Sequence, residues 1–293
     1  MIYDVRHLTS VQYAGLVRLA RFNLRLKPAP WPSQTLQSYS LTIDPLPWTI
    51  QEEAGPYLVN RSRMTLRDPI SRLSIESRFR VEVSPPVQAI DPAAGPSVGD
   101  VRVQALERRD ISPASPASYL YASPIAGSEP EIAQWARGFF DGDSSVAAAG
   151  QALMAAIHSQ FRYDDEATAT DTPPLAAFNE RRGVCQDFTH IMIIAARAHA
   201  IPAAYVSGYL RTLPPPGRPR LVGADAMHAW VNLWCGNELG WIGFDPTNNL
   251  IVGSDHIFTA MGRDYGDIAP LDGVFHGGEG QKMDVSVDVA PVG

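Results

Sequence analysis

A strict alternation of apolar and polar residues between Arg72 and Val83 constrains the fold more than any other feature. In RLSIESRFRVEV the side chains on one face are apolar and those on the other are mostly charged; the apolar ones are Leu73, Ile75, Phe79, Val81 and Val83. Successive side chains of a strand point to opposite faces, so this period predicts a half-buried antiparallel strand. Similar periods at 22–26, 39–43 and 101–106, with only a weak helical signal from Val11 to Leu19, predict a small antiparallel β-sandwich.

The pattern becomes helical after the proline-rich stretch ISPASPASYLYASPIAGSEP. Apolar stripes at helical spacing follow, and the last helical run covers 186–199. Short aromatic segments bounded by Gly or Pro then predict strands: AAYVSGYL, HAWVNLW and WIGFDPT. The basic stretch LPPPGRPR between the first two predicts a stiff loop. We therefore predict an α+β fold with a β-rich domain at 1–112 and a second domain at 113–293.

Composition narrows the classes of partner. The 293 residues are 45% hydrophobic with a formal net charge of −7, which argues against a nucleic-acid partner. The N-terminal stretch is interrupted by basic residues and predicts no signal peptide, and no apolar run reaches the roughly 18 residues of a membrane span. Two cysteines make no disulfide framework. We expect a cytoplasmic protein without a membrane partner; its oligomeric state is not predicted.

The segment RRGVCQDFTH sets Cys185 after a glycine and just before an apolar helical run. Backbone N–H groups at a helix start stabilise a thiolate, which is the nucleophilic form of cysteine. Cys185 therefore lies where a catalytic cysteine would be activated. The alternative is a small buried apolar residue, the usual role of an intracellular cysteine.

Two further segments supply the partners that such a nucleophile needs. His228, in DAMHAWVNLW, begins a predicted strand 43 residues after Cys185, and a histidine facing a helix start can act as general base. Asp245, in GWIGFDPTNN, lies 17 residues past His228 on the next strand and can orient the imidazole. Taken singly, His228 could be a packed histidine and Asp245 a turn residue before Pro246.

Together the three segments resemble the motif blocks of the bacterial transglutaminase-like superfamily. The resemblance extends to IPAAYVSGYL and to GRDYGDIAPLDG near the C-terminus, and the first third resembles the β-rich domain that precedes this core in two-domain members. It implies a papain-like core in which a helix carrying Cys185 packs on an antiparallel sheet carrying His228 and Asp245. The roles carried over are nucleophile, general base and acid, and orienting carboxylate. One departure is Thr189, where members usually have alanine.

The resemblance implies a thiol acyl-transfer enzyme acting on peptide or protein substrates through a thioester. We expect hydrolysis, as by a peptidase or amidase, because water is always available. The alternatives are a protein-glutamine transglutaminase that forms isopeptide cross-links and a non-catalytic binding or scaffold protein. The family also suggests peptide-forming ATP-grasp proteins as partners. We expect no cofactor.

Neighbouring residues allow narrower expectations. The backbone N–H of Cys185 is expected to be one oxyanion donor, with Tyr163 or Gln186 as the second. Core packing is an equal alternative for Tyr163. Trp230 is a candidate substrate contact, although tryptophans on the sheet are expected to be mostly core. Asp187 is expected to cap its helix or to pair locally, with Arg263 as a candidate. His190 is expected to hydrogen-bond within the core or near the site. A zinc site of Cys185, His190 and His228 is not expected, since Cys-x-x-Cys and His-x-x-x-His pairs are missing.

Overall fold

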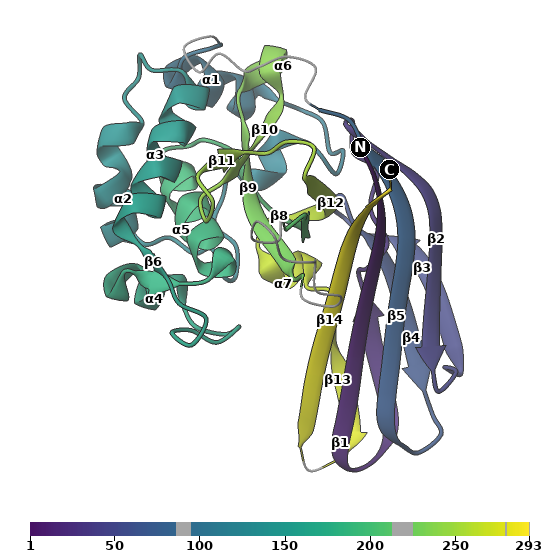
Figure 1. The fold of residues 1–293 in the computed structure, drawn as a ribbon. Coiled ribbons are helices and arrows are strands. Elements are labelled where there is room, and N and C mark those ends of the chain that lie inside the picture. Colours follow the sequence, from purple (N-terminus) through teal and green to yellow (C-terminus); the bar gives the residue numbers. More distant parts are fainter. Residues whose placement is uncertain (86–94, 213–224, 279, 293) are drawn as a thin grey trace, which may run out of the picture.

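The computed structural model describes residues 1–85, 95–212, 225–278 and 280–292. The loop expected at 213–220 lies outside these residues. Figure 1 shows helices packed on one side of a central sheet and a second sheet of long strands on its other side. The helices are α1 (Val98–Glu107), α2 (Pro130–Ala136), α3 (Val146–Gln160), α4 (Pro174–Glu180), α5 (Cys185–Ala198), α6 (Gly236–Leu239) and α7 (Tyr265–Ile268), with 3-10 turns η1 (Pro116–Tyr119) and η2 (Arg137–Phe139).

The sheet of long strands is built around the first strand of the chain. It contains β1 (Ile2–Leu24), β2 (Gln34–Asp44), β3 (Thr49–Ala54), β4 (Asn60–Leu66), β5 (Ile70–Val83), β13 (Leu271–Gly277) and β14 (Gln281–Val292). All pairings are antiparallel: β1 is flanked by β5 and β4 on one edge and by β14 and β13 on the other, with β2 and β3 outside β5 and β4. The strand expected at Arg72–Val83 is confirmed as β5, with its apolar face buried.

This sheet curls on itself and forms two apolar clusters. One lies within the curl and joins side chains of β1, β2, β4 and β5, among them Phe22, Met64 and Leu73. The other joins the opposite half of the sheet to the central sheet, where Tyr3 and Phe79 pack with Tyr209 and Ile257. Burial of these side chains removes apolar surface from water, which is the main force that holds the two sheets together.

The central sheet has the order β11-β10-β9-β8-β12 and is antiparallel throughout. Its strands are β8 (Ala203–Leu210), β9 (Met227–Trp234), β10 (Trp241–Asp245), β11 (Leu250–Ile251) and β12 (His256–Gly262); a short parallel pair, β6 (Arg162–Tyr163) and β7 (Arg182–Gly183), lies beside the start of α5. Helix α5 packs on β9 and β8, and its apolar residues share one cluster with those of α3 and β9. The α+β class predicted from the sequence is confirmed.

Two local predictions were wrong. Residues 101–106 lie in helix α1, because a capping box formed by Ser97 and Asp100 begins a helix that buries Val98, Val101 and Ala105. Residues 11–19 lie in β1, where bulges between Gln12 and Val17 and between Val17 and Leu19 shift the alternation.

The division expected at residue 112 also differs from the packing at both ends. Helix α1 belongs to the apolar cluster of α3 and α5, so the second unit begins before residue 112. Strands β13 and β14 join the sheet of β1, so the end of the chain returns to the first unit, and the pairing of Ile2 with Val292 sets the two termini side by side (Figure 1).

Candidate active site

Cys185 is the first residue of helix α5. The preceding Val184 is extended, and its backbone N–H donates to the Asp187 carboxylate at 2.8 Å, so the third helical residue caps the helix from within. The thiol therefore lies at the positive end of the helix dipole, beside N–H groups that have no acceptor inside the helix. The residue is partly exposed.

The Asp187 carboxylate is buried and has a second local donor. Thr168 Oγ1 donates to Asp187 Oδ2 at 2.7 Å, which ties the segment after β6 to the start of α5. The capping role expected for Asp187 is confirmed, whereas the pairing with Arg263 was wrong. Arg263 instead pairs with Asp267 at 2.9 Å, since Arg263 lies just before α7 and Asp267 lies within that helix, four residues on.

His228 is the second residue of β9 and lies opposite Gly208 of β8. Its Nε2 lies 2.8 Å from Asp245 Oδ2, and the Cys185 side chain lies near enough to be one of the groups that raise the pKa of the imidazole. Since Nε2 is engaged by the carboxylate, Nδ1 is the ring nitrogen left to face the thiol. The side chain is only 10% exposed, so it is largely shielded from water.

Asp245 ends β10 and is fully buried. Its Oδ1 accepts the backbone N–H groups of Thr247 and Asn248 at 3.0 and 3.1 Å. Its Oδ2 accepts from the Asn248 side chain at 2.8 Å, in addition to His228. A carboxylate held by this many donors has one fixed orientation, and so has the imidazole bonded to it.

Electrostatics favour an ion pair at this position. Burial lowers the pKa of His228, but its hydrogen bonds to Asp245 and Cys185 outweigh burial and raise that pKa to about 10. Burial raises the pKa of Asp245, but hydrogen bonds from His228 and His256 hold it well below its usual range. The imidazole is therefore protonated and the carboxylate ionised at neutral pH, which is the arrangement that stabilises a neighbouring thiolate.

Two residues of the site were missed by sequence reasoning. Asn248 donates to Asp245, and a signal for it existed, because an amide three residues after an aspartate is typical of a turn in which side chain and backbone share one acceptor. His256 begins β12, and its Nε2 lies 3.2 Å from the same Asp245 oxygen. Strand order alone would not place it there, since β8 and β9 separate β12 from β10 in the sheet.

The three residues proposed for the oxyanion or the substrate have different surroundings. Tyr163 is 57% exposed, so it is not packed in the core, and the neighbouring Cys185 contributes, after burial, to raising its phenol pKa. The Gln186 amide donates to the Thr170 carbonyl at 2.9 Å, which commits it to the neighbouring loop. Trp230 is 1% exposed, and its placement favours core packing.

His190 is buried in α5, as expected. The backbone N–H of Tyr265 donates to its Nε2 at 3.3 Å, which joins the nucleophile helix to the GRDY segment. Burial lowers the pKa of His190 to about 4, so this histidine is neutral at physiological pH.

Among the described residues, one group of side chains could collect around a metal ion: ligand atoms of His228, Asp245 and His256 lie within 4.8 Å of one another. Each of these atoms is already a hydrogen-bond partner within the group. A metal would have to displace those bonds, and the group differs from the set of Cys185, His190 and His228 weighed from the sequence.

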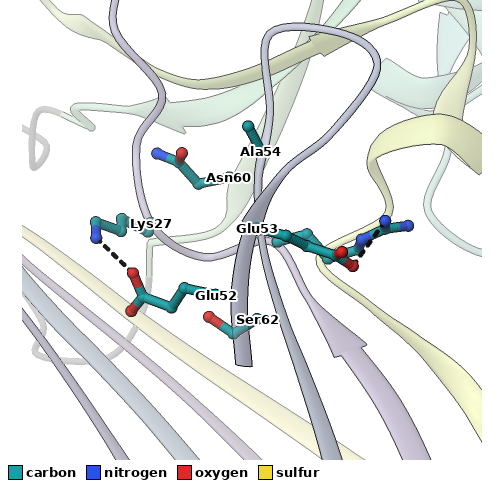
Figure 2. Close-up of a pocket in the computed structure, with 7 residues that line it drawn as sticks. Lys27, Glu52, Glu53, Ala54, Asn60 and Ser62 are labelled. Atoms are coloured by element: carbon teal, nitrogen blue, oxygen red, sulfur yellow. Dashed lines mark hydrogen bonds and ion pairs between the residues drawn. The ribbon is translucent and has the colours of Figure 1, made fainter. Parts of the chain in front are cut away.

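A separate pocket of about 190 Å³ is lined by residues of β3 and β4 and by Lys27 (Figure 2). Its acidic side chains are internally paired: Glu52 with Lys27 at 2.8 Å and Glu53 with Arg61 at 2.7 Å. None of its lining residues belongs to the group around Cys185.

Within the described residues, no helix has the length and apolar character needed to cross a membrane.

Comparison with known proteins agrees with this geometry. Residues 133–246 match the transglutaminase-like superfamily, and residues 3–82 match the bacterial transglutaminase-like N-terminal region. An uncharacterised protein of Mycobacterium tuberculosis is 34% identical over 298 residues, which cover 99% of this chain and 92% of that protein. The chain belongs to the transglutaminase-like superfamily, as the resemblance had predicted.

Two further similarities concern the core segment and the fold of the whole chain. A protein-glutamine gamma-glutamyltransferase of Pseudomonas aeruginosa is 36% identical over 105 residues, which cover 33% of this chain and 16% of that protein. The crystal structure of a proposed cysteine protease from Cytophaga hutchinsonii superposes with a TM-score of 0.74 at 19% identity, covering 100% of this chain and 92% of that one. The second likeness shows a shared fold over the whole chain.

Proposed function

We propose that this protein is a thiol acyl-transfer enzyme that cleaves peptide or amide bonds, with Cys185 as nucleophile, His228 as general base and acid, and Asp245 as orienting carboxylate. One observation carries the proposal: a cysteine at a helix start lies near an imidazole that is held 2.8 Å from a buried carboxylate. A scaffold protein has no need of a protonated histidine beside a cysteine.

The reaction has two halves. Cys185 Sγ attacks the carbonyl carbon and forms a C–S bond; His228 gives its proton to the leaving nitrogen as the C–N bond breaks, and a thioester remains. Water then attacks the thioester and passes one proton to His228. The C–S bond breaks, the acid product leaves, and the thiolate–imidazolium pair is restored.

The second half-reaction separates hydrolysis from cross-linking. We favour hydrolysis because water reaches any partly exposed thioester, and Cys185 is partly exposed. The alternative is transfer of the acyl group to a lysine-type amine. The similarity to the Pseudomonas aeruginosa protein-glutamine gamma-glutamyltransferase supports this alternative.

A peptide pool containing glutamine tests both outcomes. The protein is incubated with the pool, with and without a biotin-labelled primary amine, and products are identified by mass spectrometry. Chain cleavage or glutamine deamidation in both samples supports hydrolysis, and biotin incorporation supports transfer. Wild-type protein quenched with acid during turnover should carry the acyl fragment on Cys185, and the mass of that fragment reveals the substrate.

Three substitutions measure the roles of the residues. We expect Cys185→Ala to abolish turnover, and His228→Ala and Asp245→Asn to reduce kcat by about 10³ to 10⁴-fold, with effects that do not add because the three act as a unit. Cys235→Ala is the matched control, since the other cysteine is buried. Unchanged activity in Cys185→Ala would exclude the covalent mechanism.

A further inference from the structure

We propose that His256 is a positioning residue that fixes the Asp245 carboxylate and, through it, the His228 imidazole. This inference rests on the proposed function, because it assigns a residue outside the cysteine, histidine and aspartate to the same chemistry. The starting observation is that His256 Nε2 lies 3.2 Å from the Oδ2 atom that His228 contacts at 2.8 Å.

The hydrogen bonds of His256 define its tautomer. The backbone N–H of Gly253 donates to Nδ1 at 3.4 Å, so Nδ1 carries the lone pair. Nε2 then carries the proton and donates to Asp245 Oδ2. His256 thus donates to the carboxylate through Nε2 and accepts at Nδ1, whereas His228 has one nitrogen on the carboxylate and the other free for the thiol.

Packing holds the His256 ring in this orientation. His256 is 5% exposed, and the Trp230 indole lies edge-on to it, with ring centroids 5.3 Å apart and planes at 77°. The indole lies over Gly208, where a Cβ atom would approach it to 2.5 Å. The absence of a side chain at Gly208 therefore gives Trp230 the space from which it supports His256.

The strand that carries His256 is fixed from the sheet of long strands. The Gln34 amide exchanges two hydrogen bonds with the Phe258 backbone, at 2.8 and 2.9 Å. The Trp31 ring stacks on Phe258 with centroids 4.5 Å apart. Tyr3 donates to Asp255 at 2.7 Å, one residue before His256. The curled sheet thereby supports the site through β12.

Loss of the donor should loosen the carboxylate. If a phenylalanine ring replaced the His256 imidazole, a buried lone pair of Asp245 would face an apolar group, and the carboxylate could rotate toward its remaining donors. The His228 ring would then be less well aimed at Cys185. At metal sites, removing the outer hydrogen-bond partner of a ligating histidine or carboxylate typically costs 10 to 100-fold, and by analogy we expect about a tenfold loss here.

The experiment compares His256→Phe, which keeps a ring of similar size but no donor, with His256→Gln, whose amide nitrogen can replace Nε2. The matched control is His276→Phe, at an exposed position on β13. The readout is the rate at which iodoacetamide alkylates Cys185 at about pH 6, where an ordinary thiol with a pKa near 8.5 reacts slowly. This rate requires no knowledge of the substrate.

We expect fast alkylation of the wild type, the control and His256→Gln, and about tenfold slower alkylation of His256→Phe. Equal rates for the wild type and His256→Phe would overturn the role of His256 while leaving the proposed function intact. Slow alkylation of the wild type would overturn both. If His256→Phe does not fold, the imidazole nitrogen shifts of ¹⁵N-histidine-labelled wild type decide: a proton on Nε2 alone supports the proposal, and a proton on Nδ1 overturns it.

Discussion

Two histidines share one oxygen of Asp245, yet their surroundings give them different chemistry. His228 lies near Cys185 and has a raised pKa, whereas His256 has a backbone donor on its second nitrogen and faces the Trp230 ring. A proton on His228 is stabilised by two neighbours that bear negative charge when ionised. Only His228 can therefore exchange a proton with a substrate held at Cys185.

The raised pKa of His228 predicts a difference between two pH profiles. Turnover needs a protonated imidazole for the leaving amine, so kcat/KM should fall as pH rises through about 10, where His228 loses its proton. Alkylation of Cys185 needs only the thiolate and should not fall there. Both rates, measured up to about pH 11, check this. A loss of turnover near pH 7 would mean that Asp245 and Cys185 do not raise the pKa.

The raised pKa of His228 also makes the free energy of unfolding depend on pH. The folded-state pKa of His228 lies above its unfolded value of about 6.5. The ion pair therefore stabilises the fold fully below about pH 6.5, and this contribution is lost as pH rises through about 10.

The three candidate residues could be predicted because each lies at the end of an element that its neighbours mark: a glycine before Cys185, an aromatic strand after His228, and a Pro-bounded turn after Asp245. His256 could not. Its contact with Asp245 depends on the path of 246–255 from β10 to the far edge of the sheet, and neither spacing nor periodicity encodes that path.

At the scale of the elements, the start of helix α5 requires a residue without a side chain at Gly183. A Cβ atom at Gly183 would lie 2.5 Å from Asp187 Oδ2, the oxygen that caps the helix. Gly183→Ala should displace this carboxylate, lower the free energy of unfolding by about 1–2 kcal/mol, and slow alkylation of Cys185. Urea unfolding and the alkylation rate measure both effects. Gly138→Ala is the control, since within the described part of the chain no atom beyond its own neighbours lies within 4 Å of a Cβ built there; equal behaviour of the two variants would contradict the role of Gly183.

The same helix contains a buried hydroxyl that can be removed. Thr189 is fully buried, and within the described residues its Oγ1 has no hydrogen-bond partner. Thr189→Val replaces this hydroxyl by a methyl group of similar size, so the free energy of unfolding should rise by about 1 kcal/mol. Denaturant titration checks the sign. A decrease would show that the hydroxyl has a partner in solution, such as water.

Element prediction from the sequence failed where a local pattern fitted two periods. In 101–106 the valines alternate as in a strand, but burial follows Val98, Val101 and Ala105 at helical spacing. In 11–19 the bulges of β1 insert residues that break the alternation. The long regular strand at β5 has no bulge within its predicted range against β1, and its pattern was unambiguous.

At the scale of the whole molecule, the contact between the two sheets includes a buried histidine. His7 of β1 lies 3.0 Å from the Tyr209 hydroxyl and 3.1 Å from the Thr9 hydroxyl, and burial lowers its pKa to about 4. The unfolded chain therefore binds this proton at a higher pH than the folded one. The resulting stability is full above about pH 6.5 and is lost as pH falls toward 4.

Acidification should accordingly weaken the fold before carboxylates titrate. From pH 7 to pH 5, we expect His7 alone to lower the free energy of unfolding by about 2 kcal/mol. Urea unfolding at both pH values measures the loss, and His7→Gln should reduce its size. His276→Gln, at an exposed position, should leave the loss unchanged. An identical pH dependence of the wild type and His7→Gln would show that this interface does not carry the effect.

The pairing of β1 on both of its edges has a consequence for biosynthesis. On the ribosome, β1 emerges first and can meet β5 once residue 83 has left the exit tunnel, but its other edge stays open until 281–292 follow. An open strand edge is a template for mispairing with other chains. The nascent chain thus carries an unprotected edge on the first half of β1 until β14 has been made, and the pairing of β14 then covers that edge.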